Sequence, residues 1–202
     1  MSKHQTKPFS QDLQDWIKGG QKKTLESLLK IFEEKSFAIL FFLLLALPAL
    51  PIPTGGLTHL TEVIAMLVCL QLIIGRKEVW LPKGWKKRDV SSIVEGKAAG
   101  KLVSFIKWFE KFSRQRLGWI LNQQITLSFL GIIILCFTLA AFSAPPFSGL
   151  DTLPALGVVI ISLGLILEDF LVALFGIIVG AIGVSLIIAA GTAIYSGFTH
   201  FF

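Results

Sequence analysis

The sequence predicts an all-α integral membrane protein: two hairpin repeats with Pro/Gly-broken apices, an interfacial amphipathic helix and a final spanning helix. Hydrophobic residues make up 53% of the 202 residues and charged residues 16%, with a mean hydropathy of +0.73, whereas a soluble domain carries about 25% charged residues. Several apolar runs approach the roughly 20 residues that a spanning helix needs. All nineteen Lys and Arg lie between Lys3 and Arg116, so the basic part of the chain should stay on the cytoplasmic side.

Residues 1–36 are predicted to form a cytoplasmic or interfacial amphipathic segment. Between residues 11 and 36, apolar side chains recur at intervals of three and four, with Lys and Glu between them, which is typical of a surface helix. Gly19 and Gly20 should divide it. The segment lacks the apolar region of a secretory signal, so no cleavable signal peptide is expected. The rest, residues 37–202, is predicted to be a single membrane domain.

The first hairpin is predicted over residues 37–76. Its first arm, residues 37–47, is apolar, but Pro48, Pro51 and Pro53 follow it, and proline stops or kinks a helix because it lacks a backbone donor. A second apolar run at residues 57–74 returns the chain. The short first arm either spans the membrane or dips in and returns, and a re-entrant arm must be covered by protein or line a polar cavity.

A basic linker, residues 77–124, follows the first hairpin. Its apolar stripe consists of Leu102, Phe105, Ile106, Phe109 and Phe112. Lys and Arg occupy the other faces, and Trp residues, which prefer the headgroup level, lie along the segment. We therefore expect a helix along the cytoplasmic membrane surface, between about Trp80 and Trp119. A second hairpin over residues 125–169, with a Pro-containing apex at 143–152, and a final helix over 170–195 complete the domain.

The two hairpins resemble each other in sequence. A shift of 93 residues aligns Pro53 with Pro146, Gly56 with Gly149 and Leu57 with Leu150, and further Leu and Ile identities follow. Each hairpin has an apolar run, a Pro/Gly break, a second apolar run and then charge, and internal repeats are common in membrane transporters. Basic segments flank the first hairpin and precede the second. Both apices should therefore lie on the outer side, in parallel repeats.

Charge and cysteine usage also bound the partners. The net charge of +6 comes from segments beside the membrane, so it indicates orientation and attraction to anionic lipid headgroups rather than nucleic-acid binding. Cys69 and Cys136 lie in apolar runs without neighbouring ligands, where thiols act as small hydrophobes, and no disulfide, metal or cofactor is expected. Small residues in the last helix permit close helix packing, either within the chain or in a homo-oligomer.

Three segments, taken in order, resemble the signature segments of a known family. They are Ala46-Leu47-Pro48-Ala49-Leu50-Pro51-Ile52-Pro53-Thr54-Gly55-Gly56-Leu57, then Gln71-Leu72-Ile73-Ile74-Gly75-Arg76 followed by Trp80-Leu81-Pro82, and Leu163-Gly164-Leu165-Ile166-Leu167-Glu168-Asp169. Over about residues 24–186 the chain resembles the ExoD family of bacterial inner-membrane proteins. The resemblance implies a role in making or exporting surface polysaccharide.

The leading candidate site lies at the apices. Glu62 is the only Asp, Glu, Lys or Arg between Phe37 and Gly75, and an ionisable group at membrane depth is a candidate functional residue. Thr58 and His59 precede it by one helical turn, and Thr54 lies in the apex itself. Asp151 takes the place of Thr58 in the second repeat and could face this cluster. The alternatives are a solvated Glu62 near the outer interface and an Asp151 that caps the next helix.

A second set of polar residues has a predicted structural role. Gln71 could hydrogen-bond to another helix, and Arg76 suits the C-terminal end of its helix. Glu168 and Asp169 stand between two apolar runs, where they could pair with Arg76 or form a solvated turn. No catalytic triad, phosphate loop or metal-ligand spacing is present, and the three His are scattered, so we do not expect an enzyme.

Two functional hypotheses follow. In the first, the protein supports exopolysaccharide synthesis or export by binding or translocating an anionic lipid-linked or small polar substrate at the facing apices. In the second, it is a structural or regulatory subunit that docks on a polysaccharide synthase or exporter through its basic face. A carrier needs polar groups that converge at the apices, whereas a scaffold should have apices filled with Leu and Phe.

Overall fold

The structure, a computed structural model, describes residues 9–20, 22–31, 35–50, 57–87, 89, 97–112, 117–145 and 148–201. Ten helices form in this part of the chain. They are α1 (Phe9–Lys18), α2 (Leu25–Ile31), α3 (Ser36–Leu45), α4 (Leu57–Ile73), α5 (Lys83–Lys86), α7 (Lys97–Phe112), α8 (Gly118–Leu121), α9 (Gln124–Ser143), α10 (Thr152–Leu167) and α11 (Phe170–Phe201). The only β pairing among the described residues is an isolated bridge between Thr24 and Asp89. The predicted all-α class is confirmed.

Four of these helices form a bundle in which each predicted hairpin contacts the other. Helix α3 packs against α4 and α10, and α9 packs against α4 and α10. Lys35, before α3, contacts the last turn of α10, and Ser128 in the first turns of α9 donates to the carbonyl of Ile73 at the end of α4. Each of these neighbouring pairs is therefore antiparallel. The apices of both hairpins lie at one end of the bundle, and their open ends lie at the other.

The core lies between the two shorter arms, α3 and α10. Nearly every residue of α3 is buried, and α10 is buried from Pro154 to Ile166 except at Leu156. Helix α11 packs closely along α10 because glycines face each other: a Cβ on Gly157 would lie 2.5 Å from the Cα of Gly180, and one on Gly164 would lie 2.4 Å from the Ala173 nitrogen. Gly176, Gly180 and Gly183 of the last helix thus serve packing within the chain, whereas a Cβ on Gly191 would meet nothing within 4 Å.

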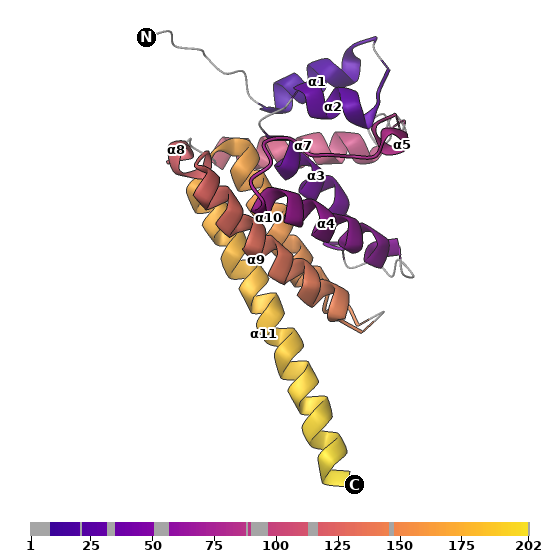
Figure 1. Cartoon of the computed structure of the whole chain (residues 1–202), viewed down its shortest axis with the longest axis vertical. Coiled ribbons are helices and arrows are strands. Elements are labelled where there is room, and N and C mark those ends of the chain that lie inside the picture. The colour runs from indigo at the N-terminus through magenta and orange to yellow at the C-terminus, as the bar shows by residue number, and fades with distance from the viewer. Residues whose placement is uncertain are drawn as a thin grey trace.

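The outer helices expose apolar faces. On α4 the side chains of Leu60, Val63, Leu67 and Leu70 are all more than 40% exposed, and α9 and α11 carry similar exposed residues. Two segments are long and apolar enough to cross a membrane, α9 and residues 170–193 of α11, whereas α3, α4 and α10 are shorter apolar helices. Figure 1 shows that the C-terminal half of α11 extends alone beyond the bundle, away from α1, α2 and α7.

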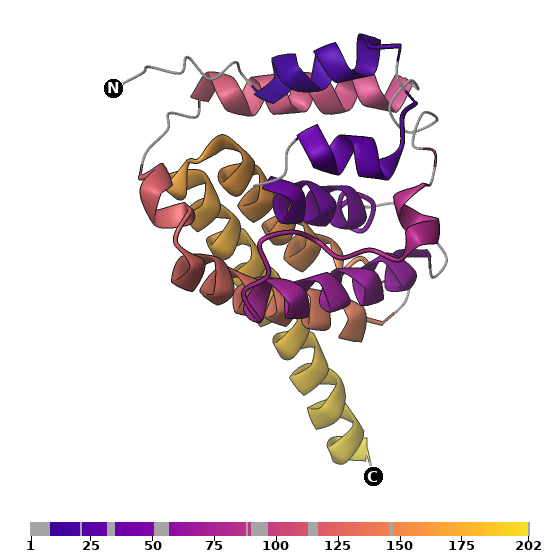
Figure 2. The same ribbon diagram turned by 45° about the horizontal axis from the view of Figure 1, so that its top comes forward.

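The basic segments form a layer over the open end of the bundle. Helices α1 and α7 lie side by side across this end (Figure 2), joined by the Ser10 hydroxyl and backbone amide, which both donate to the Glu110 carboxylate. The predicted linker helix is therefore limited to α7, while α5 and α8 are separate short helices. Within the predicted stripe Ile106 is 2% exposed, but the side chains of Leu102, Phe105, Phe109 and Phe112 lie outside the described residues.

Helices α4 and α10 end in the same hydrogen-bonded motif, 93 residues apart. The amides of Gly75 and Arg76 donate to the carbonyls of Leu72 and Gln71, and those of Glu168 and Asp169 donate to Leu165 and Gly164. Gly75 (φ +88°) and Glu168 (φ +55°) are both left-handed, as a Schellman end requires. The equivalent helix ends are what the predicted repeat implies, while Pro53 and Pro146 lie outside the described residues.

Candidate functional site

Helix α4 buries two polar residues near its beginning, Thr58 and Glu62. The outward face carries Leu60, Val63 and Leu67, whereas Thr58 is 5% exposed and Glu62 is fully buried. The two faces follow from the helical repeat, since residues three or four apart share one side. The prediction that Glu62 is solvated at the outer interface is therefore wrong.

His59 joins Glu62 to the opposite hairpin. Its Nδ1 lies 2.9 Å from Glu62 Oε2, and its ring meets that of Phe142 at the end of α9 edge to face, with centroids 5.3 Å apart. The His59 side chain is 30% exposed, so it lies between the buried carboxyl group and the surface. The arrangement connects the beginning of α4 with the end of α9, and it brings the two apices together.

Asp151 belongs to the same cluster. It stands at the N-cap position of α10, but its side chain makes no capping hydrogen bond, so the predicted alternative of a capping aspartate is wrong. Its negative charge acts on the Glu62 carboxyl group through space, without a hydrogen bond between these two described side chains. Thr54, also predicted for this site, lies outside the described residues. The apex cluster is thus Thr58, His59, Glu62 and Asp151.

One atom of the apex cluster lacks a hydrogen-bond partner. Glu62 Oε1 is buried and bonds to no described residue. A buried polar atom without a partner costs about 1–3 kcal/mol, and such atoms in native structures often mark a site for a ligand, a proton or water. The cluster can therefore accept a hydrogen bond from a group that donates one.

The second set of predicted residues lies at the opposite, open end. Lys35 Nζ lies 3.0 Å from Glu168 Oε1 and donates to the Ile166 carbonyl at 2.8 Å, so Glu168 pairs with Lys35 and not with Arg76, which is exposed. Asp169 is 2% exposed and accepts a hydrogen bond at 3.0 Å from the amide of Leu171, capping α11. The predictions of a solvated turn and of a pair between Glu168 and Arg76 are therefore wrong.

Gln71 has a local role. Its side-chain oxygen accepts a hydrogen bond at 2.8 Å from the backbone amide of Trp80, which fixes the segment after α4. The bond to another helix that was predicted for Gln71 is replaced by this one. Lys35 was missed by the sequence reasoning, because its partners Ile166 and Glu168 are far along the chain and no local pattern announces such a contact.

No three His, Cys, Asp or Glu among the described residues lie close enough together to hold a metal ion. Comparison with known proteins identifies the family of this chain. A family model described as "Exopolysaccharide synthesis, ExoD" matches residues 9–189.

The chain belongs to the ExoD family. It is 32% identical over 189 residues to an uncharacterized protein of Synechocystis sp., slr1875, and the match covers 89% of this chain and 87% of that relative. No solved structure matches the chain.

Membership of the ExoD family implies a role in exopolysaccharide synthesis. The family match covers every described residue of the apex cluster, Lys35 and the Glu168–Asp169 junction. Both ends of the bundle therefore belong to the ExoD part of the chain.

Proposed function

We propose that this ExoD-family protein is a multi-pass protein of the bacterial inner membrane that supports exopolysaccharide synthesis by binding and moving a small polar substrate at the apex cluster. The observation that carries the proposal is the buried pair of His59 and Glu62 on one hairpin, whose His59 ring contacts Phe142 at the apex of the other. Polar groups at membrane depth are expensive and usually serve function. The N-terminus and the α1–α7 layer lie on the cytoplasmic side.

The exposed faces support the membrane location. Leu, Ile and Phe cover the outside of α4, α9 and α11, and apolar patches of this extent mark an interaction surface or a membrane face. Helix α9, with 20 residues, is about 30 Å long at 1.5 Å per residue, which is the thickness of the hydrocarbon core. In the first turns of α4 the outward side chains are apolar, while the polar Thr58 and Glu62 are buried.

Charge selects between the two substrate classes expected from the sequence. The described ionisable groups of the cluster are two carboxyl groups and one imidazole, and no Lys or Arg lies between Phe37 and Gly75 or after Arg116. An anionic group would meet repulsion from Asp151 and no attracting Lys or Arg. A hydroxyl-rich group, such as a sugar, can instead donate to Glu62 Oε1. The small polar substrate is therefore favoured over the anionic one.

Glu62 can also link substrate binding to the movement of a proton. A buried carboxylate without a cation is costly, because its charge loses hydration without a matching partner. In the empty site, one proton shared between Glu62 Oε2 and His59 Nδ1 leaves Oε1 as a neutral carbonyl oxygen. When a substrate hydroxyl donates to Oε1, His59, which is partly exposed, can take the proton and exchange it with water. Substrate binding and proton movement would thus be linked through this pair.

The test is Glu62→Gln in cells and in purified protein. The amide keeps the shape of the neutral acid but cannot exchange a proton, so we expect normal expression and folding with at least a tenfold loss of polysaccharide output. Asp12→Asn, the same change in helix α1, is the matched control and should leave output unchanged. Equal, mild effects from both variants would remove the case for a site at Glu62.

The α1–α7 layer favours one alternative, a subunit that docks on the synthesis machinery. Lys107, Trp108 and Lys111 are exposed on α7; Trp is enriched in protein interfaces, and lysines around it can steer an acidic partner. In that case the double variant Lys107→Gln, Lys111→Gln would lower output while Glu62→Gln would not. The proposed carrier predicts the reverse order of effects.

A further inference from the structure

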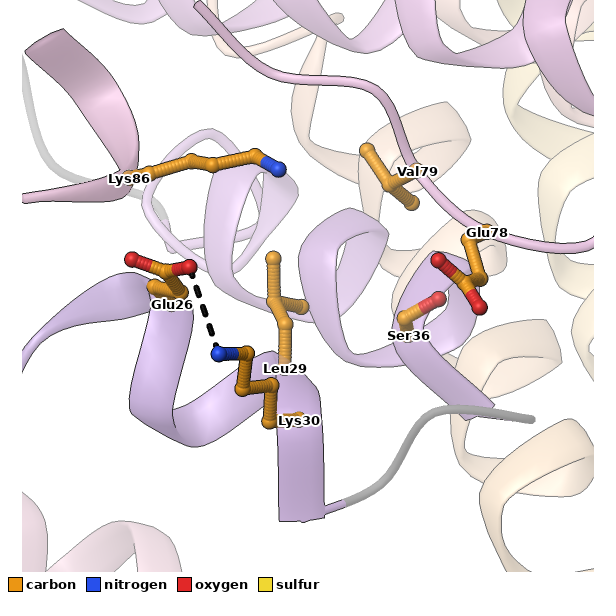
Figure 3. A pocket seen from close by; sticks show the side chains of 7 residues that line it. All are labelled: Glu26, Leu29, Lys30, Ser36, Glu78, Val79 and Lys86. Atoms are coloured by element: carbon orange, nitrogen blue, oxygen red, sulfur yellow. Dashed lines mark ion pairs between the residues drawn. The ribbon is translucent and has the colours of Figure 1, made fainter. Parts of the chain in front are cut away.

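A cavity lies at the cytoplasmic end of the bundle, away from the apex cluster. Its volume is about 120 Å³, and α2, the start of α3, the segment after α4 and α5 all contribute to it. Leu29 and Val79 form its apolar wall, and charged side chains stand around them (Figure 3). No part of the proposed carrier function uses this cavity.

Ser36 contributes a buried hydroxyl group to the cavity. It is the first residue of α3, it is only 4% exposed, and its Oγ bonds to no residue that the structure describes although it lines the cavity. A buried hydroxyl without a partner is uncommon and calls for a ligand. The amino end of α3 adds a partial positive charge at the same place.

The charged side chains that line the cavity carry both signs. Lys86 and Glu78 stand on opposite sides of the cavity in Figure 3, and neither makes an ion pair with a described residue. The other lysine, Lys30, is already held by Glu26 at 3.5 Å. The cavity thus offers Lys86 on one side and, on the other, Glu78 beside the Ser36 hydroxyl, and neither charge forms an ion pair with a described residue.

We propose that this cavity binds a phosphate–ammonium zwitterion, the headgroup of an ethanolamine phospholipid. The phosphate lies between Lys86 and the Ser36 hydroxyl, which donates to it, and the ammonium group donates to Glu78. Trp80 and Trp85 beside the cavity are 60% and 36% exposed, and Trp prefers the headgroup level of a membrane. The lipid as source rests on the membrane location proposed above, whereas the recognition of a zwitterion rests on the cavity alone.

The test compares three phospholipids on the full chain purified in detergent. Thermal unfolding midpoints, followed as each lipid is added, give apparent affinities. We expect ethanolamine lipid to bind about tenfold tighter than choline lipid, whose quaternary ammonium has no N–H donor, and tighter than glycerol lipid, which has no ammonium group. A tenfold ratio corresponds to about 1.4 kcal/mol.

Variants then assign the preference to the cavity. Ser36→Ala and Glu78→Gln should each abolish the preference for ethanolamine lipid over choline lipid, and Asp12→Asn should retain it. Glu78 is exposed, so Glu78→Gln should fold even if Ser36→Ala does not. Equal binding of all three lipids by the wild type, or an unchanged preference in Glu78→Gln, would overturn the proposal.

Soluble phosphoethanolamine separates the two sources of this chemistry. If it stabilises the protein as well as the lipid does, and Glu78→Gln removes the effect, the zwitterion site stands and the lipid is wrong as its source. None of these measurements involves Glu62, so their failure would leave the carrier proposal untouched.

Discussion

Glu62 and Glu168 lie at opposite ends of the bundle and have opposite surroundings. Glu62 is fully buried, with one oxygen on His59 and the other bonded to no residue in the described part of the chain. Glu168 is partly exposed and paired with Lys35, in a left-handed conformation that is unusual for a residue with a side chain. One acid is therefore available to a ligand, whereas the other is committed to holding two helices together.

The contact of Lys35 with α10 should contribute measurably to stability. Lys35→Gln removes the ion pair with Glu168 and the charged hydrogen bond to the Ile166 carbonyl, and hydrogen bonds to charged groups contribute about 1.5–3 kcal/mol. Because both side chains are partly exposed, we expect a loss of about 1–2 kcal/mol, measured as a lower thermal unfolding midpoint in detergent.

Lys30→Gln is the matched control for this prediction. The pair of Lys30 with Glu26 is 3.5 Å long and much more exposed, and such pairs within a helix contribute about 0.3–0.5 kcal/mol. If the two variants lowered the midpoint equally, the Lys35 contact would be no more than a surface ion pair.

Helices were predictable from local pattern, and their packing was not. Apolar runs with flanking Pro, Gly or charge placed α3, α4, α9 and α10 to within a few residues, because composition and helix breakers act locally. The linker was predicted as one helix, but only α7 has the regular apolar spacing that sustains one. Which face of α4 turns inward follows from contacts with α9, and those depend on residues distant in sequence.

The closest contact between helices gives a test of packing. Gly157→Ala would place a Cβ 2.5 Å from the backbone of α11, where no side chain can move aside, and overpacking of this kind costs about 1–3 kcal/mol. We expect a lower thermal unfolding midpoint. The control, Gly191→Ala, lies in α11, where the added Cβ would meet nothing within 4 Å. It should be neutral or raise stability by up to about 1 kcal/mol through helix propensity. A neutral Gly157→Ala would mean that α10 and α11 are less closely packed than described.

At the scale of the whole molecule, the two hairpins occupy equivalent positions in the pattern of contacts between helices. If α3 is exchanged with α9 and α4 with α10, the same four neighbouring pairs result, and the ends of α4 and α10 share one motif. A two-fold relation along the bundle would produce both features and would set Glu62 and Asp151 on facing apices. The final helix α11 and the α1–α7 layer have no counterpart in the other hairpin, and they bury α10 and α3 on one side.

The charge distribution predicts how this bundle sits in the membrane. The α1–α7 layer contains the basic segments and should be cytoplasmic, since Lys- and Arg-rich segments are retained there, whereas the apex between α9 and α10 should face outward. In a background with Cys69 and Cys136 replaced by Ala, Ser148→Cys should react with a membrane-impermeant maleimide in intact cells, and Lys97→Cys should react only after permeabilisation. Both positions lie in described segments at opposite ends of the bundle, so one experiment reports on both. Labelling of residue 97 but not residue 148 from outside would contradict this orientation, because it would place the apex cluster on the cytoplasmic side and the α1–α7 layer outside.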